Sequence, residues 1–270
     1  MILGISYSKD RILFAKNHGL DSEPEFVSFH VGAESREEST PSGSLWPKLN
    51  DDARDAFHSA EKAVLAIPAH LCYLKRLEIK SKYLETTPAY LDWLASTQLP
   101  GELAGYRFGF IKLGESFDLL SQEMLLFACL ETAVGPMIRS LAMPDLEREL
   151  ILIPEQLGLL QTLEKSISKG DIAQAGIINF ESDYATVVHM MHNRYRSSRC
   201  FGINQERDLA TDIETFLLSR ADALESLPLV ITGNPNDFHT SWSPIVPAFM
   251  GIHNLEFAAA WGVAAYEAYK

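Results

Sequence analysis

The first stretch of this chain that could do chemistry is a short hairpin with serines beside its turn. Apolar runs at Ile2–Tyr7 and Ile12–Phe14 flank a polar group that begins at Ser8, which is typical of two antiparallel strands joined by a tight turn. In many phosphate-handling folds a first turn of this kind carries an Asp and a Gly, and here Ser6 and Ser8 stand in those places. The stretch is therefore either an ordinary hairpin turn or a degenerate nucleotide-binding turn.

Other candidate sites are weaker. His189 and His192 have a spacing seen in metal sites, but no Cys or carboxylate stands beside them, so histidines of an exposed hairpin are the simpler interpretation. The acidic run Glu34–Glu38 is typical of a solvated loop. The chain has no Walker A loop, no serine nucleophile elbow and no redox pair of cysteines. Neither a metal site nor a catalytic residue is predicted.

Composition and charge exclude several classes of partner. The 270 residues are 47% hydrophobic, and the formal net charge is −13. So negative a surface repels phosphate backbones and anionic lipid headgroups, so we expect no nucleic-acid partner and no direct membrane insertion. No apolar run reaches the roughly 18 residues that span a bilayer. Three widely spaced cysteines (Cys72, Cys129 and Cys200) and the lack of a signal peptide favour a reduced, cytoplasmic protein.

The same order of elements is predicted twice: three strands, a helix and a short buried strand. The first copy consists of Ile2–Tyr7, Ile12–Phe14, Phe26–Val31, Asp51–Ala60 and Ala63–Ile67. The second consists of Ala175–Phe180, Glu181–Met191, Tyr195–Ile203, Asn204–Ala223 and Pro228–Thr232. Two such α/β units that face each other form a cleft, and ligands of α/β sheets bind at the strand ends there.

The segment between the two copies has a different organisation. Its predicted strands and helices are Lys75–Lys80, Thr87–Gln98, Tyr106–Leu113, Glu123–Leu130 and Thr132–Leu141. A buried strand at Leu150–Ile153 and a helix at Glu155–Ser168 follow. The pattern predicts an α+β insert between two α/β lobes.

Five stretches carry a resemblance to a known family: Val64–Lys80, Tyr90–Pro100, Glu123–Leu141, Pro154–Leu163 and Asn254–Tyr266. In their order and spacing they resemble the actin/hexokinase/Hsp70 superfamily, and more narrowly the PilM-like proteins of type IV pilus machines. The type II secretion L protein and FtsA share that architecture. The resemblance implies duplicated actin-like (ribonuclease H-like) α/β lobes with an inserted 1C-type subdomain and a reduced or absent 2B subdomain. The implied boundaries are 1–76 with 144–170 for subdomain 1A, 77–143 for 1C, and 171–270 for 2A.

The chain departs from the family where phosphate would bind. The family's two phosphate turns read Asp-x-Gly, and its adenosine turn is rich in glycine. The matching positions here are Gly4, Ser6, Ser8, Asn179, Gly233 and Asn234. Because Mg²⁺–triphosphate needs oxygen ligands such as carboxylates and bare backbone donors, these residues form a degenerate cofactor site. We expect no cofactor; the alternative is weak binding of ATP or ADP with Mg²⁺.

Two functional classes follow from the resemblance. The favoured one is a non-catalytic scaffold of a pilus or type II secretion platform, cytoplasmic and held at the inner membrane by the cytoplasmic tail of a bitopic partner. Its implied partner-binding residues lie where subdomain 1C leaves 1A: Tyr73, Lys75, Arg76, Glu78, Trp93 and Leu94. Homo-oligomerisation stays open. The alternative is an ATPase or small-molecule kinase, which needs acids that are lost at Ser6 and Asn179.

Overall fold

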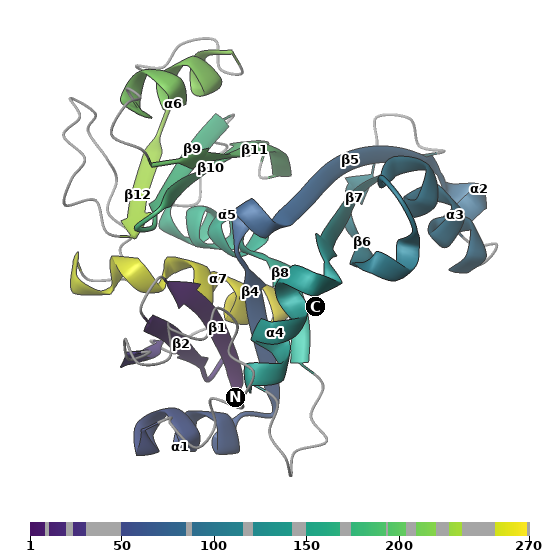
Figure 1. The fold of residues 1–270 in the computed structure, drawn as a ribbon. Helices are drawn as coiled ribbons and strands as arrows, with labels where there is room; N and C mark the ends of the chain where they lie inside the picture. The colour runs from purple at the N-terminus through teal and green to yellow at the C-terminus, as the bar shows by residue number, and fades with distance from the viewer. Residues whose placement is uncertain are drawn as a thin grey trace.

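The computed structural model describes residues 1–8, 11–19, 24–30, 50–84, 88–115, 121–141, 150–167, 174–192, 194–203, 209–219, 227–233 and 252–268. Three sheets organise these residues. Two of them belong to lobes that lie on either side of a central pair of helices, and the third belongs to an insert that projects sideways (Figure 1).

The first lobe is built on a five-stranded sheet of order β3-β2-β1-β4-β8. Its strands are β1 (Ile2–Ser8), β2 (Arg11–Asn17), β3 (Glu25–His30), β4 (Lys62–Ile67) and β8 (Leu150–Pro154). The first three form the predicted antiparallel meander, and β4 runs parallel to β1 after helix α1 (Asp51–Ser59). Because side chains alternate along a strand, Leu3, Ile5 and Phe14 face α1 and form one apolar core with it.

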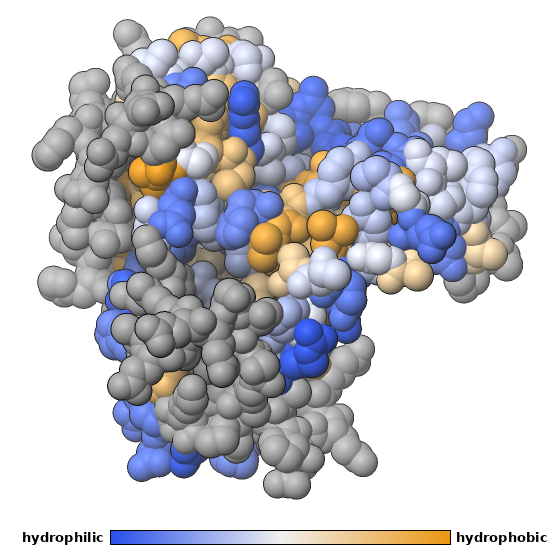
Figure 2. Space-filling model, viewed as in Figure 1, coloured by the Kyte–Doolittle hydropathy of each residue, from blue (hydrophilic) through white to orange (hydrophobic). Residues whose placement is uncertain are grey.

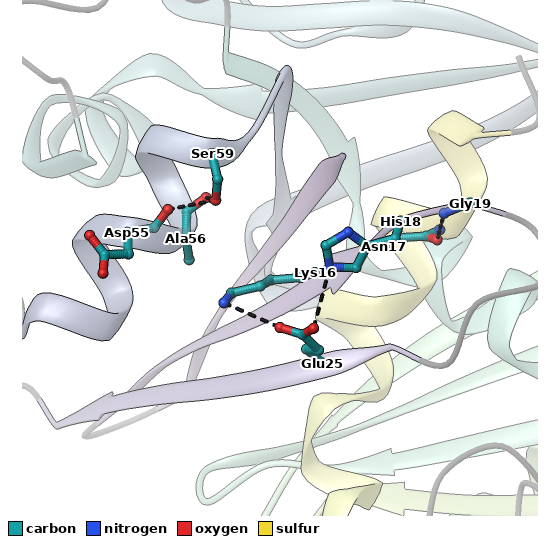
Figure 3. A network of polar contacts seen from close by, with 8 residues as sticks. All are labelled: Lys16, Asn17, His18, Gly19, Glu25, Asp55, Ala56 and Ser59. Carbon is teal, nitrogen blue, oxygen red and sulfur yellow. Dashed lines mark hydrogen bonds and ion pairs between the residues drawn. The ribbon is translucent and has the colours of Figure 1, made fainter.

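Polar contacts hold the outer edge of this sheet and the neighbouring helix (Figure 3). Glu25 on β3 pairs with Lys16 at 3.4 Å and with His18 at 3.6 Å, both from β2 or its end. Ser59 closes the last turn of α1 by donating its hydroxyl to the carbonyl of Asp55 at 2.6 Å. These side chains are exposed or half-exposed, so the contacts orient the edge and add little stability.

The second lobe is built on a four-stranded sheet of order β11-β10-β9-β12. Its strands are β9 (Gln174–Phe180), β10 (Tyr184–Met191), β11 (Arg194–Gly202) and β12 (Leu229–Gly233). As in the first lobe, three strands form an antiparallel meander and the fourth returns parallel to the first of them. Helix α6 (Leu209–Leu218) covers one face and packs Ile213, Phe216 and Leu217 into it.

Two helices between the sheets, α5 (Glu155–Ser166) and α7 (Ala258–Ala268), join the lobes into one core (Figure 1). They cross so closely that a Cβ built on Gly262 would lie 1.9 Å from the carbonyl oxygen of Gly158. On its other side α7 presses on β1, where a Cβ on Gly4 would lie 1.8 Å from the carbonyl oxygen of Ala260. The small-residue run in the last helix therefore serves backbone-to-backbone packing.

The insert is a three-stranded antiparallel sheet of order β5-β7-β6 with two helices at its far end (Figure 1). Its elements are β5 (Cys72–Lys80), α2 (Ser81–Leu84), α3 (Pro88–Gln98), β6 (Tyr106–Glu115) and β7 (Ser121–Leu130). One face of the sheet packs on Ala95 and Leu99, and the other face adds Ile111 and Leu125 to the core between the lobes. The insert is thus anchored by its inner face and free at its tip.

Helix α4 (Glu131–Leu141) follows the insert in sequence but packs on the first lobe. Leu141 lies in the core beneath α1, and the Tyr7 hydroxyl on β1 bonds the Ser140 hydroxyl at 2.9 Å. The sequence placed this helix with the insert, within 77–143. The subdomain boundaries themselves stay a prediction, and residues 143, 144, 170 and 171 lie outside the described part of the chain.

Most predicted elements are confirmed to within a few residues, and two predictions need correction. The stretch Asn254–Tyr266 is not one helix but part of a 3₁₀ segment (Ile252–Phe257) followed by α7. His189, expected on an exposed hairpin, is 1% exposed on β10, because its side chain points into the core between the sheet and its covering helices, whereas His192 is exposed. In α3, Trp93 is 58% exposed, and Ala95 packs on the sheet.

We predict that Gly262→Ala lowers the free energy of unfolding by about 2 kcal/mol or more, because the new methyl group meets backbone atoms of Gly158 that cannot move aside. Urea unfolding measures the change. Gly105→Ala is the matched control, since a Cβ there meets nothing within 4 Å. Equal effects of the two substitutions would contradict the close helix crossing.

Candidate functional site

A cleft of about 640 Å³ lies between the lobes, at the base of the insert. It collects side chains from the end of β1, from the 3₁₀ turn Ala69–Leu71 after β4, from α4, and from the turn between β9 and β10. The lining residues are Tyr7, Pro68, His70, Leu71, Met137, Glu181, Ser182, Asp183, Tyr184, Cys200 and Gly202. Figure 2 shows apolar side chains, in orange, on the surface where the insert joins the body.

A buried carboxylate beside this cleft connects the parts. Glu155 opens α5 and is 3% exposed. Its oxygens accept hydrogen bonds from the backbone N–H of Ala69 at 2.8 Å, the hydroxyl of Tyr184 at 3.0 Å and the amide Nδ2 of Asn179 at 3.0 Å. Ala69 belongs to the first lobe, and Tyr184 and Asn179 belong to the second. One carboxylate thus holds both lobes to the helix between them.

Burial raises the pKa of Glu155 above its ordinary value, and the hydrogen bonds from Ala69, Asn179 and Tyr184 oppose that rise. Since the folded-state pKa is raised, the contribution of this group to stability is complete below its unfolded pKa. This contribution is lost as the pH rises through the folded-state pKa.

A second contact crosses the cleft: the imidazole ring of His70, from the first lobe, lies 4.6 Å from the ring of Tyr184, measured between ring centres.

The first predicted phosphate turn has become part of the core. Gly4 is buried under α7. Ser6 is 5% exposed, and its hydroxyl has no hydrogen-bond partner among the described residues. Ser8 ends β1 opposite Arg11. Gly4 and Ser6 do not line the cleft, although their neighbour Tyr7 does.

The second predicted turn is occupied by structural hydrogen bonds. Asn179 is fully buried: its Nδ2 donates to Glu155 and, at 3.3 Å, to Glu181, and its Oδ1 accepts the Thr232 hydroxyl at 3.0 Å. Gly233 has φ +80°, and a Cβ on it would lie 2.0 Å from the carbonyl oxygen of Phe180. Both residues therefore have packing roles, and predicted site residue Asn234 lies outside the described residues.

The described lining of the cleft is more acidic than basic. Its lining residues, as described, include the carboxylates Glu181 and Asp183 and no Lys or Arg. Burial lowers the pKa of His70, with Asp183 acting in the opposite direction, so the imidazole is mostly neutral at pH 7. Within the described chain, no three His, Cys, Asp or Glu side chains are grouped so as to hold a metal ion. The described lining therefore offers a phosphate group neither Lys nor Arg.

Sequence reasoning missed the residues that line the cleft. Tyr7, His70 and Met137 stand in three different elements, and no motif connects them. The two acids of the β9–β10 turn could have been predicted as cleft residues, because Glu181 and Asp183 follow the end of a predicted strand. Glu155 was noted as the first residue of its helix, but its partner Asn179 is 24 positions away.

The predicted partner-binding residues are brought together only in part. Tyr73, Lys75 and Glu78 are exposed on β5, which is an edge strand of the insert. Trp93 on α3 forms an aromatic row at the tip, 5.7 Å from Tyr90, which in turn stacks on Tyr83 at 5.3 Å. Leu94 is half-buried.

Arg76, also on β5, has a guanidinium that is engaged on two sides. Nη2 donates to Glu123 on β7 at 2.6 Å, and Nη1 reaches the carbonyl oxygen of Arg196 on β11 at 3.5 Å. The side chain thus bridges the insert and the second lobe.

The helices of the described part are all too short or too polar to span a bilayer.

Comparison with known proteins identifies the fold. No protein-family model and no curated protein matches the sequence. Among solved structures, the chain aligns with the PilM-PilN type IV pilus biogenesis complex at a TM-score of 0.66 and 13% identity, covering 99% of this chain and 98% of that one. The cytoplasmic domain of EpsL, an inner-membrane component of the type II secretion system of Vibrio cholerae, aligns at a TM-score of 0.48 and 13% identity, covering 85% and 81%. The chain therefore has a PilM-like actin fold, as its sequence predicted.

We predict that Asn179→Asp, which introduces the acid expected from the resemblance, destabilises the fold. A second carboxylate would stand about 3 Å from that of Glu155, at a cost on the order of 3 kcal/mol near pH 8. Because two such carboxyls share a proton, the cost falls as the pH is lowered toward 5.

Asn50→Asp is the matched control, because Asn50 caps α1 by accepting the N–H of Ala53 at 3.0 Å, and Asp caps equally well. Urea unfolding at the two pH values measures both variants. A loss below about 1 kcal/mol for Asn179→Asp at pH 8 would refute the structural role of this amide.

Proposed function

We propose that this chain is a non-catalytic, actin-like adaptor of a type IV pilus or type II secretion platform. In this proposal it lies on the cytoplasmic side of the inner membrane and is held there by the cytoplasmic tail of a bitopic partner. The observation that carries the absence of catalysis is the state of Asn179: its amide is bound on both sides by Glu155, Glu181 and Thr232. Both N–H donors and one of the two carbonyl lone pairs are engaged, and the side chain is fully buried, so it is poorly placed to orient a hydrated Mg²⁺ or a phosphate.

The charge of the cleft supports the same proposal. Transfer of a phosphoryl group relies on cations that neutralise developing charge, supplied by Mg²⁺, Lys or Arg. The described lining residues of the cleft offer Glu181 and Asp183 instead.

The partner role rests on the fold and on the surface of the insert. The alignment spans nearly the whole of both chains, and the matched structure is a complex of PilM with PilN. In the described part of this chain, most of the exposed large apolar or aromatic side chains are on the insert: Tyr73, Tyr83, Trp93 and Leu130. Aromatic side chains of this kind carry much of the energy of protein interfaces.

Strand β5 suggests how a tail would bind. It pairs with β7 on one side and forms an edge of the sheet on the other. An extended tail could add along that edge, with backbone hydrogen bonds giving affinity and Tyr73 and Lys75 giving selectivity. Arg76 helps to fix the position of β5. Its guanidinium bonds Glu123 within the insert and the carbonyl oxygen of Arg196 on the second lobe.

We predict that the chain does not hydrolyse ATP and that its dissociation constant for Mg·ATP is weaker than micromolar. The binding free energy is then less favourable than about −8 kcal/mol. Calorimetric titration of the full chain with ATP tests this, once with Mg²⁺ and once with EDTA. Micromolar binding that EDTA abolishes would instead favour an ATPase or small-molecule kinase.

For the partner, we predict that a protein with one membrane-spanning segment is recovered from the native membrane fraction, and that Tyr73→Ala and Trp93→Ala each reduce recovery at least tenfold, as for central interface aromatics. Leu218→Ala is the matched control, because Leu218 is 53% exposed on the second lobe. Each variant must keep the melting temperature of the wild type.

The tail of the recovered protein, made as a peptide, is then titrated onto the same variants. Binding that Tyr73→Ala and Trp93→Ala leave intact would place the partner elsewhere. Arg76→Ala is a poorer test, since it removes a contact between the insert and the second lobe.

A further inference from the structure

Two strands at the base of the insert each carry a cysteine, and the register of the sheet places the two opposite each other. Cys72 is the first residue of β5, Cys129 is the last but one of β7, and the antiparallel register pairs them directly. Residues that lie directly opposite each other project from the same face of a sheet. Both thiols are free, and both side chains pack with Ile67 and Val134 in one apolar cluster.

The register brings the pair within range of a disulfide bond. Opposite residues of antiparallel strands have Cα atoms about 4.5 or 5.5 Å apart, and disulfides join Cα atoms that are about 4.4–6.8 Å apart. Their Cβ atoms are about 4.5–5.5 Å apart, slightly more than the roughly 3.5–4.5 Å of a disulfide. A small inward movement of one strand is therefore needed. Strand β5 can make it, because it is an edge strand of its sheet.

The thiol of Cys129 has a competing contact. Its Sγ donates to the carbonyl oxygen of Arg107 on β6 at 3.5 Å. Because β6 and β5 lie on opposite sides of β7, the sulfur must rotate toward Cys72 before a bond can form. A thiol is a weak hydrogen-bond donor, so this rotation gives up little.

We propose that Cys72 and Cys129 form a site of reversible oxidation, at which a low-molecular-weight disulfide such as oxidised glutathione converts the two thiols into a disulfide bond. The half-buried Cys72 reacts first, because Cys129 is only 2% exposed. This modification goes beyond the proposed adaptor function and does not depend on it.

The reaction has two steps of thiol–disulfide exchange. The thiolate of Cys72 attacks one sulfur of oxidised glutathione, so that a mixed disulfide forms and one glutathione thiolate leaves. The thiolate of Cys129 then attacks the Cys72 sulfur, and the second glutathione thiolate leaves. The protein gives up two electrons and two protons, and these convert oxidised glutathione into two molecules of reduced glutathione.

Burial sets the pace of this reaction. It raises the pKa of both thiols, that of Cys129 to about 11, and the attacking form of a cysteine is the thiolate. Formation of the bond is therefore slow near neutral pH. In a compartment that keeps thiols reduced, the pair stays a dithiol until an oxidant persists.

The bond closes the insert at its base. The chain enters the insert at Cys72 and leaves β7 at Leu130, so the closed loop contains β5, α2, α3, β6 and nearly all of β7. A cross-link of this kind stabilises a protein by restricting its unfolded chain, and the effect grows with the length of the loop. Oxidation should therefore make the insert harder to unfold.

Incubation of the full chain with an excess of oxidised glutathione at about pH 8 tests the proposal. We expect the intact protein to lose two hydrogen atoms over hours. A peptide map made without reductant should join the peptide of Cys72 to that of Cys129, and dithiothreitol should separate them. The melting temperature should rise by about 5 °C on oxidation and return on reduction.

Three variants make the assignment specific. Cys72→Ala and Cys129→Ala should each abolish the loss of two hydrogen atoms. Cys200→Ala is the matched control, because it removes the half-buried cysteine of β11 and keeps the pair, so it should oxidise like the wild type. Melting temperatures show that each variant is folded, and the peptide map of the wild type decides the assignment if one is not.

The proposal is overturned if the folded wild type forms no internal disulfide, or if the bond forms only after the chain is unfolded in guanidinium. It is also overturned if the map joins Cys200 to either of the other two cysteines, or if oxidation lowers the melting temperature. None of these results bears on the adaptor function, because recovery of the membrane partner is measured separately.

Discussion

A carboxylate without water must be compensated by donors, and this requirement organises the centre of the molecule. Glu155 takes its donors from the turn after β4, from β9 and from β10, so three segments distant in sequence are held at one point. Losing any one donor would leave the others facing a poorly compensated charge. The position of the two lobes around α5 and the shape of the cleft between them both follow from this group. The glycine crossing of α5 and α7 works with it, because it brings the sheets near enough for both to reach Glu155.

The same interaction gives a structural reason for the amide at position 179. In the family that the sequence resembles, an Asp is expected at Asn179; here the amide gives Glu155 a hydrogen-bond donor where an Asp would give a second negative charge. Gly4 precedes the first turn, and its lack of a side chain allows the close approach of α7. Both residues therefore have a role in holding the protein together.

Local pattern was enough to predict the strands, the helices and their duplicated order, because alternation and helical spacing reflect burial within one element. It was not enough for features that depend on two elements. Helix α4 adjoins the insert in sequence, yet Ser140 bonds Tyr7 of β1. The helix pattern alone does not show that Ala95 packs on the sheet while Trp93 is 58% exposed. The cleft between the lobes was predicted, but most of its lining was not, because Tyr7, His70 and Met137 become neighbours only after the lobes assemble.

The insert and the cleft are joined through a single short stretch of backbone. Ala69 donates its N–H to Glu155, His70 lies on the ring of Tyr184, and β5 begins at Cys72, directly after this turn. Farther along β5, Arg76 reaches Arg196 of the second lobe. A tail that pulled on β5 would therefore load the same segment that forms one wall of the cleft. Glu155 is so deeply buried that losing a hydrogen-bond donor would cost stability. We therefore expect this turn to move together with the lobes rather than independently of them. The base of β5 and one wall of the cleft thus share one stretch of backbone, which Glu155 and Tyr184 hold in place.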